Sequence, residues 1–297
     1  MIIDIALVKG LIAEQFPQWA HLPVTPVEPG GWDNRTFRLG TDMSVRLPSA
    51  EHYAAAVVKE QTWLPKIAPL LPLPIPSPLA MGGPGLGYPW KWSVYNWLPG
   101  EVACAGRIND MPRFAMELAA FLLALQRIDT ADAPPAPTPP TPPTPPTHRY
   151  RGGSLLIWDE QARAALTVLR DDIDVDAAAA IWQQALNAEI TADPVWFHGD
   201  VAAGNLLVED GELCAVIDFG GLAVGDPACD LAIAWKFFDA SSRDIFRSAY
   251  GADDAMWARG RGWALWKAMI VVANLIETNT LEAGSAQYVL DELLGAS

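Results

Sequence analysis

The stretch from residue 195 to residue 230 constrains the fold of this chain more than any other. An apolar run at its start stops abruptly at the polar loop His198-Gly199-Asp200. Two further apolar runs follow, 206–208 and 213–217, with Asp210-Gly211 between them. Because Asp-Gly favours the tight turn of a β-hairpin, these two runs are predicted to pair as antiparallel strands.

The predicted hairpin brings three polar residues together. Counting outward from its turn, Asn205 and Asp218 lie just beyond the two strands and meet at the open end. Asp200 precedes Asn205 by one loop, so two acids and an amide converge at the edge of a sheet. Their oxygens suit Mg²⁺, which binds through one or two carboxylates, water and substrate phosphates. Taken singly, each of these residues also suits a turn or a helix cap.

Several short motifs in this stretch occur in a fixed order. They are His198-Gly199-Asp200 with Asn205, then Ile217-Asp218-Phe219-Gly220, Gly225-Asp226-Pro227 and Asp230-Leu231-Ala232. In this order and spacing they resemble the signature of the aminoglycoside phosphotransferase family, whose members share the protein-kinase-like fold. Protein kinases have an H-R-D loop with an Asn five residues after the Asp, and then D-F-G. In this chain Gly199 stands where those kinases have Arg.

The resemblance implies a role for each polar residue of the motifs. Asp200 would accept the proton of a substrate hydroxyl, and Asn205 and Asp218 would hold Mg²⁺ on the phosphates of ATP or GTP. Asp226 and Asp230 resemble the acids that brace the catalytic loop and cap the next helix.

The resemblance also implies an α+β fold with two lobes, as in protein kinases. We expect an antiparallel-sheet lobe that binds the nucleotide over residues 1–95, a hinge at 96–101, and a mainly helical lobe over 102–297. The helical lobe would carry the catalytic loop and the acceptor site. Its proline-rich tract, 133–147, is expected to be an extended insertion in a loop, because proline lacks the N–H and fixes φ.

The first lobe offers candidate contacts for the nucleotide phosphates. Gly30 and Gly31 lie in a loop between strand-like runs, where backbone N–H groups could approach an anion, although the loop lacks the G-x-G-x-x-G spacing and also suits a plain turn. Arg46 occupies the third strand, where the family has a phosphate-pairing Lys. Glu60 would be its partner in a helix over 51–64 that Pro65 is predicted to end.

The predicted hinge supplies the contacts expected for the base of the nucleotide. The sequence from Ser93 to Glu101 ends in L-P-G-E and resembles the hinge of the family. Backbone groups around Asn96 and Leu98 would then contact the purine. A strand followed by a Pro-Gly turn is common in any fold, so the motif alone is less specific than the one at 198–205.

Charge and cysteine content restrict the partners. The chain has 297 residues and a net charge of −15, which disfavours nucleic acid and anionic membranes and would attract a cationic acceptor, although it also serves solubility. The three cysteines, Cys104, Cys214 and Cys229, are predicted to be reduced core thiols of a cytoplasmic protein. No apolar run approaches the ~20 residues of a membrane span.

The sequence therefore predicts a small-molecule O-phosphotransferase that uses Mg²⁺ and ATP or GTP. An aminoglycoside or a macrolide antibiotic is one candidate acceptor; a metabolite such as an amino alcohol or homoserine is another. The alternative from a different class is a catalytically silent nucleotide- or ligand-binding protein on the same fold, which Arg46 and the irregular glycine loop favour. The sequence leaves the acceptor, the choice between ATP and GTP, and the oligomeric state open.

Overall fold

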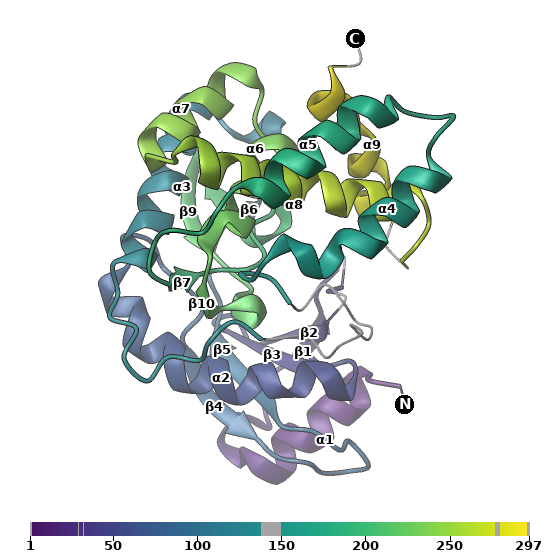
Figure 1. Cartoon of the computed structure of the whole chain (residues 1–297). Helices are drawn as coiled ribbons and strands as arrows, with labels where there is room; N and C mark the ends of the chain where they lie inside the picture. Colours follow the sequence, from purple (N-terminus) through teal and green to yellow (C-terminus); the bar gives the residue numbers. More distant parts are fainter. Residues whose placement is uncertain (1, 29, 32, 138–149, 277–279, 296–297) are drawn as a thin grey trace. The chain divides into compact units, whose positions relative to one another are not determined.

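The computed structural model describes residues 2–28, 30–31, 33–137, 150–276 and 280–295 (Figure 1). It divides into two compact units. The first unit comprises Met1–Glu101 and Cys214–Gly220, and the second comprises Val102–Leu213 and Gly221–Ser297. The first part of the first unit ends within the predicted hinge at 96–101. The segment Cys214–Gly220 was expected in the helical lobe but belongs to the first unit, where the Val216 N–H donates to the carbonyl of Pro74 at 3.2 Å.

The first unit contains a five-stranded antiparallel sheet of order β1-β2-β3-β5-β4. Its strands are β1 Val24–Pro26, β2 Asn34–Leu39, β3 Met43–Pro48, β4 Pro78–Gly82 and β5 Trp92–Asn96. The short links between the first three strands allow only hairpin pairing, as the sequence predicted. Strand β4 follows a proline-rich segment and was not predicted.

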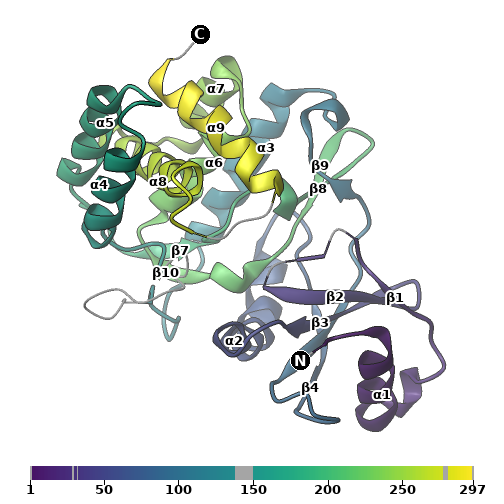
Figure 2. The same ribbon diagram turned by 90° about the vertical axis from the view of Figure 1, so that its right-hand side faces the viewer.

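Strand β5 shows why this sheet is covered on both faces. Trp92 and Val94 join a core cluster with helix α1 (Ile5–Gln15), which Asp4 caps by accepting the N–H of Leu7. Ser93 and Tyr95 alternate with them and bond to side chains of helix α2 (Glu51–Ile67). Because successive side chains of a strand point to opposite faces, α1 and α2 cover the two faces of the sheet (Figure 2).

Helix α2 ends later in the structure than the sequence predicted. Pro65 was predicted to end it, but the helix continues to Ile67 with Pro65 inside the last turn. The missing N–H removes only one bond there, and the N–H of Ala68 donates to the carbonyl of Leu64, so backbone bonding resumes beyond the ring.

The second unit is mainly helical. Its helices are α3 Met111–Gln126, α4 Asp159–Val168, α5 Val175–Asn187, α6 Ile233–Lys236, α7 Ala240–Tyr250, α8 Asp254–Val272 and α9 Thr280–Leu294. Helix α8 is buried around most of its circumference because it packs against both α5 and α9 (Figure 1). Residues 227–238 carry an apolar pattern that suits one helix, but they contain a 3₁₀ helix, Pro227–Ala232, followed by the short α6.

Short strands carry the motif region. Strand β7 (Val195–Phe197) pairs antiparallel with β10 (Ala223–Gly225). Strands β6 (Glu101–Val102), β8 (Leu206–Glu209) and β9 (Glu212–Val216) form a sheet of order β6-β8-β9. The predicted turn Asp210-Gly211 has φ of 52° and 84°, the left-handed pair that a two-residue hairpin turn requires.

The proline-rich tract is described only up to residue 137. Pro134 and Ala136 bond to the backbone of Val224, so the start of the tract lies beside β10. Residues 138–147 of the predicted insertion lie outside the described residues. None of the helices in the described ranges combines the length and apolar character that a membrane span needs.

All three cysteines are free thiols, as predicted, but the predicted core position is right for one of them only. Cys229 is buried, Cys214 is half-buried and Cys104 is exposed, and all three are free thiols. Cys104 stands just before the 3₁₀ turn Ala105–Arg107, a surface segment whose apolar neighbours in sequence suggested a core position.

Candidate active site

The loop that follows β7 is held by a buried acid. The carboxylate of Asp230 accepts the backbone N–H groups of His198 at 2.7 Å and Gly199 at 2.8 Å. Asp230 is 1% exposed, and this burial raises its pKa even though both N–H bonds favour the charged form. These two bonds fix the backbone immediately before Asp200.

Steric constraints explain why position 199 is a glycine. Gly199 has φ of 83°, and a Cβ there would lie 2.6 Å from the carbonyl oxygen of Gly221. No side chain fits such a position without moving the neighbouring backbone. The Arg found at this point of the protein-kinase motif would therefore be excluded from this loop.

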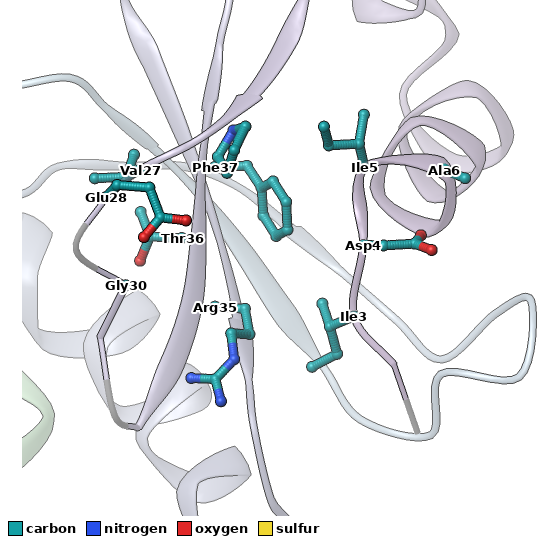
Figure 3. A pocket seen from close by; sticks show the side chains of 11 residues that line it. Ile3, Asp4, Ile5, Ala6, Val27, Glu28, Gly30, Arg35, Thr36 and Phe37 are labelled. Atoms are coloured by element: carbon teal, nitrogen blue, oxygen red, sulfur yellow. The ribbon is translucent and has the colours of Figure 1, made fainter. Parts of the chain in front are cut away.

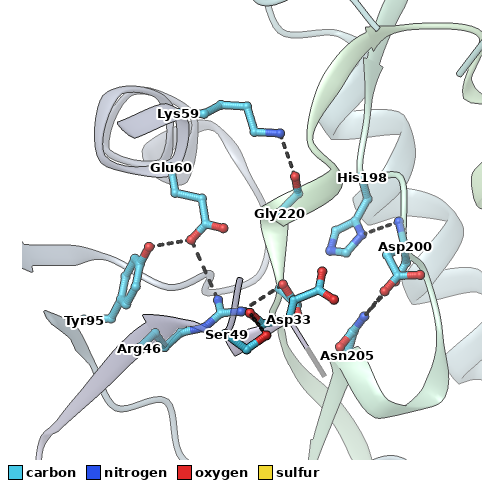
Figure 4. Close-up of polar contacts among 11 residues, drawn as sticks. Asp33, Arg46, Ser49, Lys59, Glu60, Tyr95, His198, Asp200, Asn205 and Gly220 are labelled. Atoms are coloured by element: carbon cyan, nitrogen blue, oxygen red, sulfur yellow. Dashed lines mark hydrogen bonds and ion pairs between the residues drawn. The ribbon is translucent and has the colours of Figure 1, made fainter. Parts of the chain in front are cut away.

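Asp200 and Asn205, which the sequence placed near one another, are in direct contact (Figure 4). The amide nitrogen of Asn205 donates to the backbone carbonyl of Asp200 at 2.8 Å and to its Oδ2 at 3.1 Å. The N–H of Asp200 donates to Nδ1 of His198 at 3.1 Å. The side chain of Asp200 remains 46% exposed, so its carboxylate is both oriented and accessible.

Arg151, from a separate segment of the chain, also contacts this loop, and sequence reasoning missed it. Its Nη1 donates to the carbonyl of Gly199 and to Oδ1 of Asp200. Burial alone would raise the pKa of Asp200, but the charge and hydrogen bond of Arg151 outweigh it and hold that pKa well below its usual range. In the sequence Arg151 is only a basic residue before two glycines at a helix start. Nothing in that pattern indicates that its partner lies 49 positions further along the chain.

A buried ion pair lies behind the loop. Arg259 on α8 donates to Asp226 through Nε at 2.8 Å and through Nη2 at 3.2 Å, with both side chains almost fully buried. Asp226 also caps the 3₁₀ helix by accepting the N–H of Ala228. Both acids of the Gly225-Asp226-Pro227 and Asp230 motifs thus serve the architecture around Asp200.

Asp218 lies in the first unit, in contact with Arg46 of β3. Nη2 of Arg46 donates to Oδ1 of Asp218 at 3.0 Å, and its Nη1 lies 3.7 Å from Oε2 of Glu60 on α2. Burial lowers the pKa of Arg46, but Asp218 and Glu60 raise it by more, so the guanidinium stays charged. Tyr95, a second residue that the sequence did not reveal, donates its hydroxyl to Glu60 (Figure 4).

The backbone beside Asp218 is held as well. Lys59 of α2 donates to the carbonyl oxygen of Gly220 at 2.7 Å, and Asp218 itself has φ of 66° in the left-handed region. The predicted meeting of Asn205 with Asp218 stays a prediction, because Asn205 belongs to the second unit and Asp218 to the first.

The remaining predicted residues lie in the first unit. Gly30 lines an open pocket of about 410 Å³ with Ile3, Asp4, Ile5, Ala6, Pro26, Val27, Glu28, Arg35, Thr36 and Phe37 (Figure 3). The carbonyl of Gly31 accepts Nη1 of Arg35 at 2.6 Å. Asn96 is engaged by Ser77 through both its backbone N–H and its side-chain oxygen, and Leu98 is half-buried two residues further on.

Known proteins match both the sequence and the fold. The sequence model of the phosphotransferase enzyme family (APH) matches residues 24–263, well over half of the chain. No match was found among curated protein sequences. Three similar solved structures are the GDP complex of wild-type aminoglycoside 2'-phosphotransferase-IIIa, the streptomycin-ATP-APH(2")-IIa ternary complex, and the apoenzyme of macrolide 2'-phosphotransferase MphH from Brachybacterium faecium.

These structures agree with the whole chain in fold. The aminoglycoside 2'-phosphotransferase-IIIa complex is 17% identical with a TM-score of 0.71, covering 99% of each chain. The APH(2")-IIa complex is 16% identical with a TM-score of 0.61, covering 99% of this chain and 100% of that one. MphH is 19% identical with a TM-score of 0.60, covering 99% of each chain. The chain thus belongs to the phosphotransferase enzyme family and has its two-lobed, α+β kinase-like fold.

Proposed function

We propose that this protein transfers the γ-phosphate of ATP or GTP to a hydroxyl group of a small molecule. The observation that carries the proposal is the state of Asp200, an accessible carboxylate held between Arg151 and Asn205 on a loop that Asp230 braces. A carboxylate so held can orient a hydroxyl for in-line attack and accept its proton.

The residues proposed for Mg²⁺ suit that ion by their chemistry. Asn205 turns its amide nitrogen to Asp200, so its amide oxygen remains for a cation, and Asp218 has a second carboxylate oxygen beside the one that faces Arg46. Bound Mg²⁺ would neutralise phosphate charge. Within the described residues, no three His, Cys, Asp or Glu side chains form a metal-binding group, which agrees with an ion that relies on phosphates and water for most of its ligands.

We assign nucleotide binding to the first unit. Arg46 would pair with phosphate in place of the family's Lys, since a guanidinium can bind phosphate and carboxylate oxygens together. Glu60 holds Arg46 in place, Gly30 and Gly31 would bring backbone N–H groups to the phosphates, and the backbone at Asn96 and Leu98 would meet the base. Because Ser77 already engages the N–H of Asn96, we assign more of that contact to the backbone nearer Leu98.

For the acceptor we propose an aminoglycoside or macrolide antibiotic. Similar structures are complexes with streptomycin, kanamycin or gentamicin, and the net charge of −15 favours a cationic acceptor. One observation favours a second candidate, a binding protein without turnover: Arg46 contacts both Asp218 and Glu60 and so engages one carboxylate oxygen of the acid proposed for Mg²⁺. A kinase of an amino alcohol or of homoserine would share the catalytic residues proposed here.

The test is transfer of label from γ-labelled ATP and GTP, with Mg²⁺, to a pooled panel of antibiotics, amino alcohols, homoserine and sugars. Asp200→Asn is the matched control, because it keeps the shape of the side chain and removes the charge. We expect label in an acceptor with the wild-type protein and a rate roughly 10²- to 10⁴-fold lower with the variant. Equal rates in the two proteins would exclude the assigned mechanism, and Mg²⁺-dependent nucleotide binding without transfer would support the binding protein.

A further inference from the structure

Arg151 lies against the proposed catalytic carboxylate, but the proposed function gives it no role of its own in the reaction. Its side chain is 18% exposed, and it bonds to a different oxygen of Asp200 than Asn205 does: Arg151 binds Oδ1 and Asn205 binds Oδ2. The same Nη1 also binds the carbonyl of Gly199. The arginine therefore ties the carboxylate to the backbone of its own loop.

The turn that carries Arg151 is fixed by close packing and by a backbone hydrogen bond. Gly152 has φ of 77°, and a Cβ there would lie 2.2 Å from the ring of Phe197 on β7. The carbonyl of Gly152 accepts the N–H of Asp226 at 2.8 Å, and Asp226 is held in turn by Arg259. Because this turn packs on Phe197 and is bonded to Asp226, Arg151 is held in place and differs from a mobile surface arginine.

We propose that Arg151 is a positioning residue for Asp200, holding one carboxylate oxygen so that the other faces the acceptor hydroxyl in a fixed direction. This inference rests on the proposed function. Arg151 remains charged at all working pH values because arginine does not lose its proton in proteins. With Arg151 on one oxygen and Asn205 on the other, the carboxylate cannot rotate without breaking a hydrogen bond.

The experiment compares Arg151→Gln and Arg151→Lys with the wild-type protein. Arg170→Gln serves as a matched control for the loss of one positive charge, because Arg170 is 72% exposed and pairs only with its neighbour Asp171. The first measurement is kcat and the KM values for nucleotide and acceptor, with the labelled nucleotide and the acceptor from the panel. The second is far-UV circular dichroism with urea unfolding, which shows whether each variant is folded.

In Arg151→Gln we expect kcat to fall roughly 10- to 100-fold with the KM for nucleotide unchanged. Arg151→Lys should lie between wild type and Arg151→Gln, and Arg170→Gln should match wild type.

Wild-type kcat in both Arg151→Gln and Arg151→Lys would overturn the proposal, and so would a loss in Arg151→Gln that Arg170→Gln matches. If Arg151→Gln does not fold, Arg151→Lys decides alone, because an ammonium keeps the charge but lacks the planar geometry of the guanidinium, so kcat must still fall. Transfer by the wild type that the variants retain refutes the role of Arg151 alone. Absence of transfer by the wild type refutes the phosphotransferase and this inference with it, so the two failures are distinguishable.

Discussion

Each of the two units pairs an arginine with one of the acids proposed for catalysis, but they do so by different means. In the first unit Arg46 contacts two carboxylates, those of Asp218 and Glu60, and the second of these is held by Tyr95. In the second unit Arg151 contacts a single carboxylate and a backbone carbonyl.

The difference lies in what fixes the acid. In the first unit the partners are side chains that project from β3, β5 and α2, so regular secondary structure sets their directions. In the second unit Asp200 stands on a loop, and its position depends on backbone N–H groups that Asp230 accepts and on glycines that no other residue can replace. We therefore expect the second unit to lose more stability when a bracing residue is removed.

The largest effect should come from Arg259→Met. It leaves the carboxylate of Asp226 buried without its partner, and breaking such a pair costs about 3–5 kcal/mol. Urea unfolding monitored by circular dichroism measures the loss. The control is Arg170→Met, whose exposed ion pair should contribute less than about 1 kcal/mol. Equal losses in the two variants would show that the buried pair of Arg259 and Asp226 adds no more stability than an exposed ion pair.

Asp230→Ala should have the next largest effect. The N–H groups of His198 and Gly199 lose their acceptor, and we expect the free energy of unfolding to fall by about 2–3 kcal/mol. Asp239→Ala provides the comparison, because Asp239 caps α7 at the surface and its removal should cost about 1 kcal/mol. If Asp230→Ala were the milder variant in chemical denaturation, backbone bracing would not hold the loop.

Arg46→Gln should change nucleotide binding where Arg151→Gln does not. Loss of the guanidinium removes the proposed phosphate contact, and we expect the Kd for Mg²⁺-nucleotide to rise about tenfold, or about 1.4 kcal/mol. Isothermal titration calorimetry on both variants gives the comparison. A higher Kd in Arg151→Gln than in Arg46→Gln would contradict the assignment of the nucleotide to the first unit.

The smallest predicted effect is a difference in stability between variants of two tyrosines of the first unit. Tyr95 donates to the carboxylate of Glu60, whereas Tyr88 donates to the neutral carbonyl of Pro48 at 3.0 Å. Hydrogen bonds to charged groups contribute about 1.5–3 kcal/mol and neutral ones about 1 kcal/mol. Tyr95→Phe should therefore lower the midpoint of thermal unfolding more than Tyr88→Phe does. The reverse order would mean that the contacts among Arg46, Glu60 and Tyr95 add little stability.

Local sequence was sufficient where one short segment supplies both partners. Asp210-Gly211 determines the hairpin turn, and Asn205 reaches Asp200 across a single loop, so both features could be predicted. The prediction failed where partners come from distant segments. Nothing near Arg151 in sequence indicates that it faces Asp200, and Tyr95 reads as an ordinary strand residue until α2 brings Glu60 beside it.

Periodicity also failed to distinguish kinds of helix. Residues 227–232 carry an apolar pattern that suits an α-helix, but the side chain of Asp230 accepts the N–H of His198, and the segment adopts the tighter 3₁₀ form. Pro65 is a similar case, because the rule that proline ends a helix holds less strictly in a last turn, where few bonds remain to be lost.

The division of the first unit between two parts of the chain has a consequence for biosynthesis. Cys214–Gly220 follows Glu101 by more than a hundred residues. At ~5–20 residues per second, a ribosome releases this segment on the order of ten seconds after the sheet has been made. During that interval the contact between Arg46 and Asp218 cannot form, because Asp218 has not yet been synthesised. The first unit is therefore completed only after β7 and β8 have been synthesised.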